Sequence, residues 1–305
     1  MKKHLSIILL ATLAYGCKSK PERITINLEK GQVYTQDMSV KSSSEQTMKG
    51  TKTKSINLSE SRNRFEVLAV KDTVYTIKVT YETMATKIVK DGDTINQNMP
   101  GQANPVASLG SKLVGKSFTM MMSNTGRVLE TKGIDAIFND LFSQVPEQLR
   151  AMMQKSLASA YGDSAIRRNA EMSRALYLAK AVKEGDTWPF ENGGGQNIMT
   201  PKVKGVYTLD KVTDSDYEIS NKSTIEIVNS PTPLEMQNFS IKYDVSGNMT
   251  SKNKVDRKTG MITEMKAVQD IKGMIVLHTT SQNSEEMVMP ITAKNEVTLI
   301  TKFIK

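Results

Sequence analysis

A single cysteine has the most informative chemistry in this 305-residue chain. Cys17 ends the sequence Leu13-Ala14-Tyr15-Gly16-Cys17, which follows two lysines and a short apolar run. A positive start, an apolar core and small residues before a cut are typical of a secretory signal. A cysteine directly after that cut indicates a lipoprotein whose acyl chains bind the membrane. We therefore predict a signal peptide over residues 1–16 and lipidation of Cys17. An ordinary signal cut elsewhere and a short uncut anchor are the alternatives.

Histidine and the carboxylates form no catalytic or metal-binding pattern. After the predicted cut the chain has one histidine, His278, in a strand-like stretch, whereas a histidine-based zinc site needs several ligands. The carboxylates lack the spacing of a metal loop or of a paired acid and base; they include Asp135, Asp140, Glu264 and Asp270. We expect no catalytic residue, no metal, no cofactor and no enzymatic activity. A hydrolase that uses His278 is the weakest function considered.

Methionine is the one residue type in excess, with 19 in the chain. Its clusters Met120-Met121-Met122 and Met152-Met153 allow three interpretations: Cu(I) binding, an adaptable lining for an apolar pocket, or filling of the core. Alternate residues of a strand face opposite sides, so at most two of the first cluster share a face. Core filling is the interpretation we favour.

The elements that position these residues are mainly β-strands. Apolar and polar residues alternate from Ile24 onward, as in half-buried strands, and the pattern recurs to the end of the chain. Tight-turn signals such as Asp91-Gly92 join neighbouring strands, so the sheet must be antiparallel. So many strands do not remain in one flat sheet. We predict a mainly β (α+β) fold, with a large curved antiparallel sheet or open half-barrel.

One block, at about residues 133–181, has helical periodicity instead. Its first apolar stripe falls at helical spacing on Ile134, Ile137, Phe138, Leu141 and Phe142. A helical insert must bury such a stripe, and the simplest place is the concave face of the sheet, where it would enclose an apolar pocket. We expect this pocket to be lined by Phe138, Leu141, Phe142, Met152 and Met153.

Residues 17–23 are expected to form a polar tether, and residues 24–305 a single β-rich domain. The formal charge is +9, but the basic residues are scattered and aromatic residues are few, so nucleic acid is not expected as a partner. A faint internal repeat aligns residues 65–77 with residues 207–219. It indicates either two related β halves around the helical insert or the chance similarity of two hairpins.

Several motifs together resemble an uncharacterised lipoprotein family of Bacteroidota, a domain of unknown function. They are the lipoprotein signal, Leu113-Val114-Gly115-Lys116-Ser117-Phe118-Thr119, Gly126-Arg127-Val128, Glu184-Gly185-Asp186-Thr187-Trp188 and Val255-Asp256-Arg257-Lys258-Thr259-Gly260. The resemblance covers most of the mature chain and implies no catalytic residues. Surface-exposed lipoproteins of that group often carry acidic residues after the cysteine, whereas Lys18, Ser19 and Lys20 follow it here. This favours the periplasmic face of the outer membrane.

The curved sheet with a helical insert is also loosely similar to lipoprotein carriers, whose members hold acyl chains; this is an analogy of fold alone. We expect a membrane-anchored periplasmic lipoprotein that binds a hydrophobic or lipid-like ligand in the concave face and is not an enzyme. The alternative is an envelope scaffold or accessory subunit without a small ligand.

Overall fold

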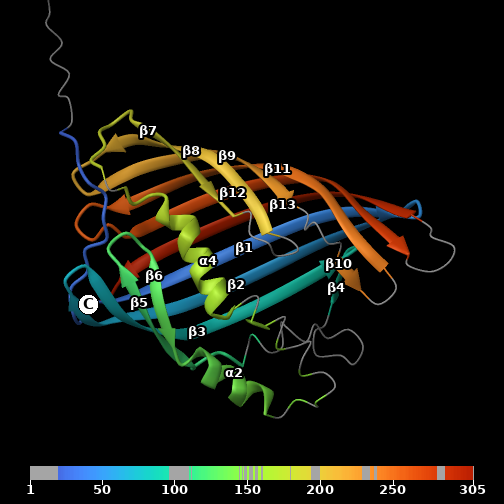
Figure 1. Ribbon diagram of the computed structural model, residues 1–305, viewed down its shortest axis with the longest axis horizontal. Helices are drawn as coiled ribbons and strands as arrows, with labels where there is room; N and C mark the ends of the chain where they lie inside the picture. Colours follow the sequence, from blue (N-terminus) through green and yellow to red (C-terminus); the bar gives the residue numbers. More distant parts are fainter. Residues whose placement is uncertain are drawn as a thin grey trace, which may run out of the picture.

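The computed structural model describes residues 20–95, 110, 112–143, 145, 147, 150, 154, 157–158, 161–178, 180–193, 200–228, 234–236, 239–279 and 286–304. Within these residues, thirteen strands form one antiparallel sheet that curls around the two helices described and does not close on itself (Figure 1). The predicted curved antiparallel sheet with a helical insert is confirmed.

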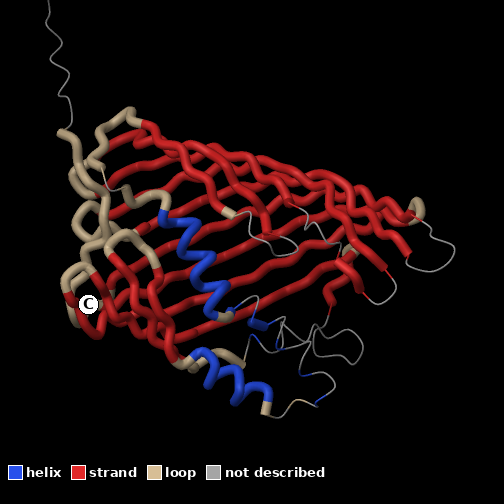
Figure 2. The backbone as a smooth tube through the Cα atoms, viewed as in Figure 1, coloured by secondary structure: helices blue, strands red, loops and turns tan. Residues whose placement is uncertain are grey.

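The strands range in length from three to 21 residues. They are β1 Val33–Met48, β2 Thr51–Lys71, β3 Val74–Lys90, β4 Asp93–Ile95, β5 Ser117–Ser123, β6 Val128–Lys132, β7 Thr187–Asn192, β8 Thr200–Val212, β9 Asp216–Val228, β10 Leu234–Met236, β11 Phe239–Asp256, β12 Ile262–Thr279 and β13 Glu286–Phe303. The helices are α2 Ile134–Phe142 and α4 Asp163–Arg174. Both helices lie on the same side of the sheet (Figure 2).

The strand order shows two meanders joined at the middle. Across the sheet it runs β6-β5-β3-β2-β1-β13-β12-β11-β9-β8-β7, with β4 and β10 as short additions. The chain moves outward from β1 to one edge at β6 and crosses through the helical insert to the other edge at β7. It then returns inward until β13 pairs with β1. The insert therefore connects the two free edges of the sheet.

The internal repeat seen in the sequence corresponds to two matching hairpins. The β2–β3 pairing shifts register between Val67 and Ala69, and the β8–β9 pairing shifts between Leu209 and Lys211, at the same offset in the repeat. The aligned tyrosines, Tyr75 and Tyr217, are both buried. The similarity thus extends to the position of the bulge, which chance alternation does not specify.

One end of the curled sheet is closed by the segment that precedes β1, and we call it the plugged end. Ile24, Ile26 and Leu28 are buried, as their alternation predicts, but they form no ladder. Their backbone binds the strand turns instead: the Ile26 amide donates to the Asn124 carbonyl at 2.8 Å, and the Asn27 amide donates to the Thr259 carbonyl at 2.8 Å. The predicted strand is therefore a plug, because its partners are turns rather than a neighbouring strand.

Helix α4 crosses the opening between the two edge strands. At its first residue, Asp163 accepts a hydrogen bond from Thr131 of β6 at 2.6 Å. One turn later, Arg167 donates to the carbonyls of Val128 and Leu129 at 2.9 and 3.0 Å. Beyond its other end, the indole of Trp188 in β7 donates to the carbonyl of Ala175 at 2.8 Å. These bonds also satisfy backbone acceptors on β6, whose unpaired edge would otherwise be open to another strand.

Candidate functional site

The outer face of the sheet, opposite the helices, is highly charged. The register places oppositely charged residues side by side, such as Lys41 with Glu296 and Lys254 with Glu264, at 3.7 and 3.3 Å. Such exposed pairs contribute little stability, usually below about 1 kcal/mol each. They do show that this face is solvated, because an ionised side chain is costly to remove from water.

The concave face has almost no charge. By register, every charged side chain described in β1, β2, β8, β9, β11, β12 and β13 lies on the outer face. Within the paired strands described, two charged residues lie on the concave side, Lys90 and Asp93. They are opposite each other at the tip of the β3–β4 hairpin. This separation of charge between the two faces defines the candidate site.

Part of the concave side is filled by the protein itself. Phe138, Leu141 and Phe142 of α2 are buried in the main hydrophobic core, which also includes Phe118 of β5. Their predicted contact with a ligand stays a prediction. Cys17, Met152 and Met153 lie outside the residues that the structure describes.

A belt of uncharged polar residues crosses the middle of the concave face, and we call it the neutral belt. Its members, from β2 to β9, are Asn57, Ser42, Asn295, Gln269 and Ser223. Asn295 donates to Gln269 at 3.1 Å. Among the described residues, Gln269 donates only to the thioether of Met249 at 3.4 Å, a weak acceptor. Within the described part of the chain, the hydroxyl groups of Ser42 and of its neighbour Ser44 have no hydrogen-bond partner, although both residues are half-buried. These groups can bind a further polar molecule.

Beyond the belt, toward the end opposite the plug, the concave side of β11, β12 and β13 is apolar. We call this surface the distal wall. It consists of Ile241, Tyr243, Val245, Ile271, Ile275, Leu277, Met287, Met289 and Ile291. Apart from the buried Val245, these side chains are half-buried. Burial raises the pKa of the Tyr243 phenol, in keeping with apolar surroundings.

Gly273 sits within the distal wall and allows β11 and β12 to approach closely. Its φ is 156°, and a Cβ there would lie 2.0 Å from the Asp244 carbonyl oxygen and 2.7 Å from the Val245 Cα. Any side chain would push the strands apart. A glycine at such a position permits the bend that wraps the wall around the concave side.

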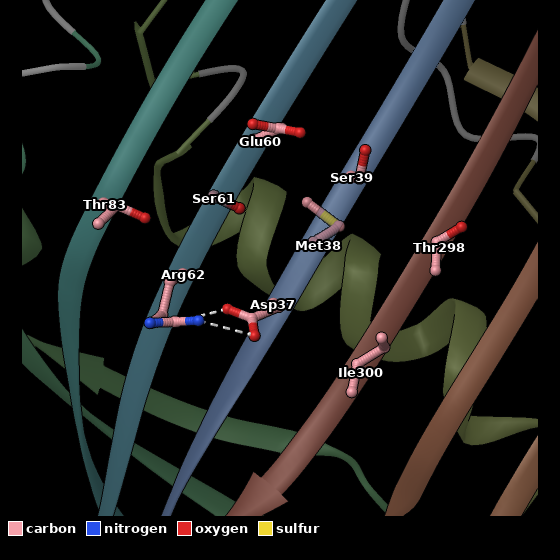
Figure 3. A pocket seen from close by; sticks show the side chains of 9 residues that line it. All are labelled: Asp37, Met38, Ser39, Glu60, Ser61, Arg62, Thr83, Thr298 and Ile300. Atoms are coloured by element: carbon pink, nitrogen blue, oxygen red, sulfur yellow. Dashed lines mark hydrogen bonds and ion pairs between the residues drawn. The ribbon is translucent and has the colours of Figure 1, made fainter.

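A separate hollow of about 360 Å³ lies on the outer face over β1, β2 and β13 (Figure 3). Its centre is a two-point ion pair, in which Arg62 donates to the Asp37 carboxylate at 2.6 and 3.1 Å. The Arg62 hydrogen bond holds the pKa of Asp37 below its usual range. Figure 3 shows a helix behind the strands, so the hollow and the concave face are on opposite sides. Its charges and hydroxyls suit water better than an apolar ligand.

The other residues considered for chemistry have structural positions. Met120 and Met122 are buried in the main core, which fits core filling. His278 lies on the outer face, 3.8 Å from the Glu286 carboxylate. Among the described residues, no group of histidine, cysteine and acidic side chains could hold a metal ion. In the same part of the chain, every helix is too short or too polar to cross a membrane.

The fold and its faces define a curled antiparallel β protein with a charged exterior and an uncharged, partly apolar concave face. The chain belongs to a family of unknown function, DUF6263, whose model matches residues 72–262. The matched part contains the turns at Gly126 and Gly260 that bind the plug, together with Trp188. A search of curated proteins gave no match.

Two solved structures show partial likeness to the chain. The first is lipovitellin, described for its lipid–protein interactions, with 11% identity over 90% of this chain and a TM-score of 0.44. The chain spans only about a quarter of lipovitellin, 25% of its length. The second is the outer membrane protein OprG from Pseudomonas aeruginosa, with 8% identity over 90% of this chain and 97% of that one, and a TM-score of 0.26.

Proposed function

We propose that this protein is a lipid-anchored bacterial envelope protein of the Bacteroidota that binds a hydrophobic ligand on its concave face and catalyses no reaction. The observation that carries the proposal is the separation of charge between the two faces of the sheet. A protein that only filled its interior would need a covered core, whereas eight of the nine apolar side chains of the distal wall are only half-buried. Each methylene of a ligand that this wall removes from water stabilises the complex by about 0.8 kcal/mol.

The distal wall has the dimensions of an extended chain. On β12 it runs from Ile271 to Leu277, six residue steps, or about 20 Å at roughly 3.3 Å per residue. The same length of β13 runs alongside it. This surface suits a long acyl or similar chain better than a compact solute.

The ligand test compares two neighbouring residues of β12 that point to opposite faces. Ile275 pairs with Met289 on the concave side, whereas Met274 pairs with Asp244 on the outer side. The processed protein, purified in mild detergent, should carry lipid that native mass spectrometry detects. We expect Ile275→Lys to reduce bound lipid about tenfold or more, while Met274→Lys retains it.

Folding of both variants is checked by circular dichroism, and Ile291→Asn offers a milder change in the same wall. If the wild-type protein carries no lipid and crosslinking in cells captures one stoichiometric protein partner, the protein is a scaffold or accessory subunit, and ligand binding is rejected.

The anchor is tested separately. We propose that cleavage before Cys17 and acylation of its sulfur hold the protein on the periplasmic face of the outer membrane. Mass spectrometry of the N-terminal peptide should show the acyl chains, and Cys17→Ser should release the protein into the soluble periplasmic fraction. An unmodified Cys17 in the membrane fraction would refute lipidation without affecting the ligand test.

A further inference from the structure

We infer that the ligand is an uncharged amphiphile, with an apolar chain along the distal wall and a hydroxyl- or ester-bearing headgroup at the neutral belt. The inference rests on the proposed function and specifies the chemistry of its ligand. It follows from how belt and wall are joined and from where the charges lie.

Belt and wall are continuous along single strands. On β13, Asn295 of the belt is followed on the same face by Ala293 and then by Ile291 of the wall. On β12, Gln269 is followed by Ile271 in the same way. A molecule lying along these strands would therefore meet amide groups at one end and aliphatic groups at the other.

The belt offers hydrogen bonds but no counter-charge. Ser42 and Ser44 of β1 are half-buried and, among the described residues, unpartnered, and Gln269 donates only to a thioether. A hydroxyl or ester oxygen can bind such groups at little cost. An ionised headgroup placed there would lose hydration without gaining an ion pair, which disfavours its binding.

The nearest concave charges do not change this conclusion. Lys90 is opposite Ser55 and Asp93 is opposite Lys90, so the two lie together at the hairpin tip. They are of opposite sign, and both are exposed. The neighbouring β1 charges, Lys41 and Glu45, lie on the outer face.

The experiment uses three probes that share one oleoyl or oleyl chain: monoolein, which is neutral; oleate, which is anionic; and oleylamine, which is cationic. Each competes at pH 8 for a fluorescent lipid bound to the delipidated full-length protein. We expect monoolein to compete at about tenfold lower concentration than either charged probe.

A matched pair of serines tests the cause of that preference. Ser42 lies on the concave face, and Ser43 lies beside it on the outer face; both are half-buried. Ser42→Lys should lower the competing concentration of oleate several-fold, and Ser43→Lys should leave all three values unchanged. If oleate competes as well as monoolein in the wild-type protein, the inference fails while ligand binding stands. If none of the three competes and no lipid copurifies, the proposed function itself fails.

Discussion

Single residues at the plugged end show how the N-terminal segment is held. Gly260 has a φ of 67°, and a Cβ there would lie 1.9 Å from the Thr25 carbonyl oxygen. Glu22 accepts hydrogen bonds from Tyr217 and Arg257, each at 2.6 Å. The Tyr217 hydrogen bond, with help from Arg257, lowers the pKa of Glu22 below its ordinary value of 4.5. The hydrogen bonds of Glu22 with Tyr217 and Arg257 therefore stabilise the folded position of the N-terminal segment.

Gly260→Ala should be among the most destabilising single substitutions in the chain. The new methyl group would add a backbone clash to the cost of a left-handed residue, for a total of about 3 kcal/mol or more. Gly31→Ala is the control, because Gly31 has a φ of 86° but nothing within 4 Å of its Cβ position. That variant should lose only about 1 kcal/mol. Urea unfolding measures both, and equal losses would show that the plug is not closely held.

Glu22→Gln should weaken the protein in a pH-dependent way. Because the folded-state pKa of Glu22 is lowered, its stabilisation is present above 4.5 and is lost as the pH falls through the folded value. The difference in melting temperature between wild type and variant should therefore be largest near pH 7 and shrink in acid. The group is partly exposed, so we expect a small effect, below about 1 kcal/mol. A difference that stays constant down to pH 3 would contradict this role.

At the scale of elements, the sequence predicts correctly the turn and the helix whose formation depends on residues close together in the chain. Asp91-Gly92 forms the expected tight turn, with φ of 51° and 97°. The stripe from Ile134 to Phe142 is a helix with its apolar side buried. Ile24 to Leu28 is buried in alternation but is not a strand, since its partners are turns from distant parts of the chain. Alternation of apolar and polar residues indicates which side of a segment is buried, but it does not indicate which part of the protein covers that side.

Helix α4 is attached to the edge strand β6 through Asp163 and Arg167. Arg167 joins the helix to two carbonyls of β6 and to Asp163, so Arg167→Ala should loosen the helix while the central strands stay intact. Amide hydrogen exchange in residues 163–174 should accelerate by about tenfold, as expected for loss of one or two charge-assisted bonds. Emission from Trp188, the only tryptophan, should also change, because its indole binds Ala175.

The control is Arg174→Ala, which among the described residues removes only a surface pair with Glu171 at 2.7 Å. Its exchange should match that of the wild type. Faster exchange throughout the sheet in Arg167→Ala would mean that α4 supports the whole fold rather than only bridging the two edges.

At the scale of the whole molecule, the candidate site depends on register, which single segments do not reveal. In β11, β12 and β13 the charges occupy even-numbered positions, for example Lys252, Glu264 and Glu296. This parity is a sequence signal for one solvated and one uncharged face. The apolar stripe of the helical block indicates a different place, a pocket beside α2, which stays a prediction. Only strand pairing shows that the serine-rich strand β1 lies beside the aliphatic strand β13.

If Cys17 carries the proposed anchor, the plug determines which end of the molecule lies nearer the membrane. Five residue steps separate Cys17 from Glu22, which is bound at the plugged end, so the reach is at most about 18 Å. The turn between β1 and β2 lies at the other end of the 16-residue β1, about 50 Å away. The distal wall should therefore face away from the bilayer, toward incoming ligand.

Fluorescent labels at the two ends test this orientation in vesicles that carry an acceptor dye on their lipid headgroups. With Cys17, the only natural cysteine, acylated as proposed, Lys258→Cys at the plugged end and Thr51→Cys at the distal end each give one labelling site. We expect strong energy transfer from the label at 258 and weak transfer from that at 51. Cys17→Ser should abolish transfer from the label at 258. Equal transfer from both labels would mean that the molecule lies along the membrane, and the wall would then receive its ligand from the bilayer surface.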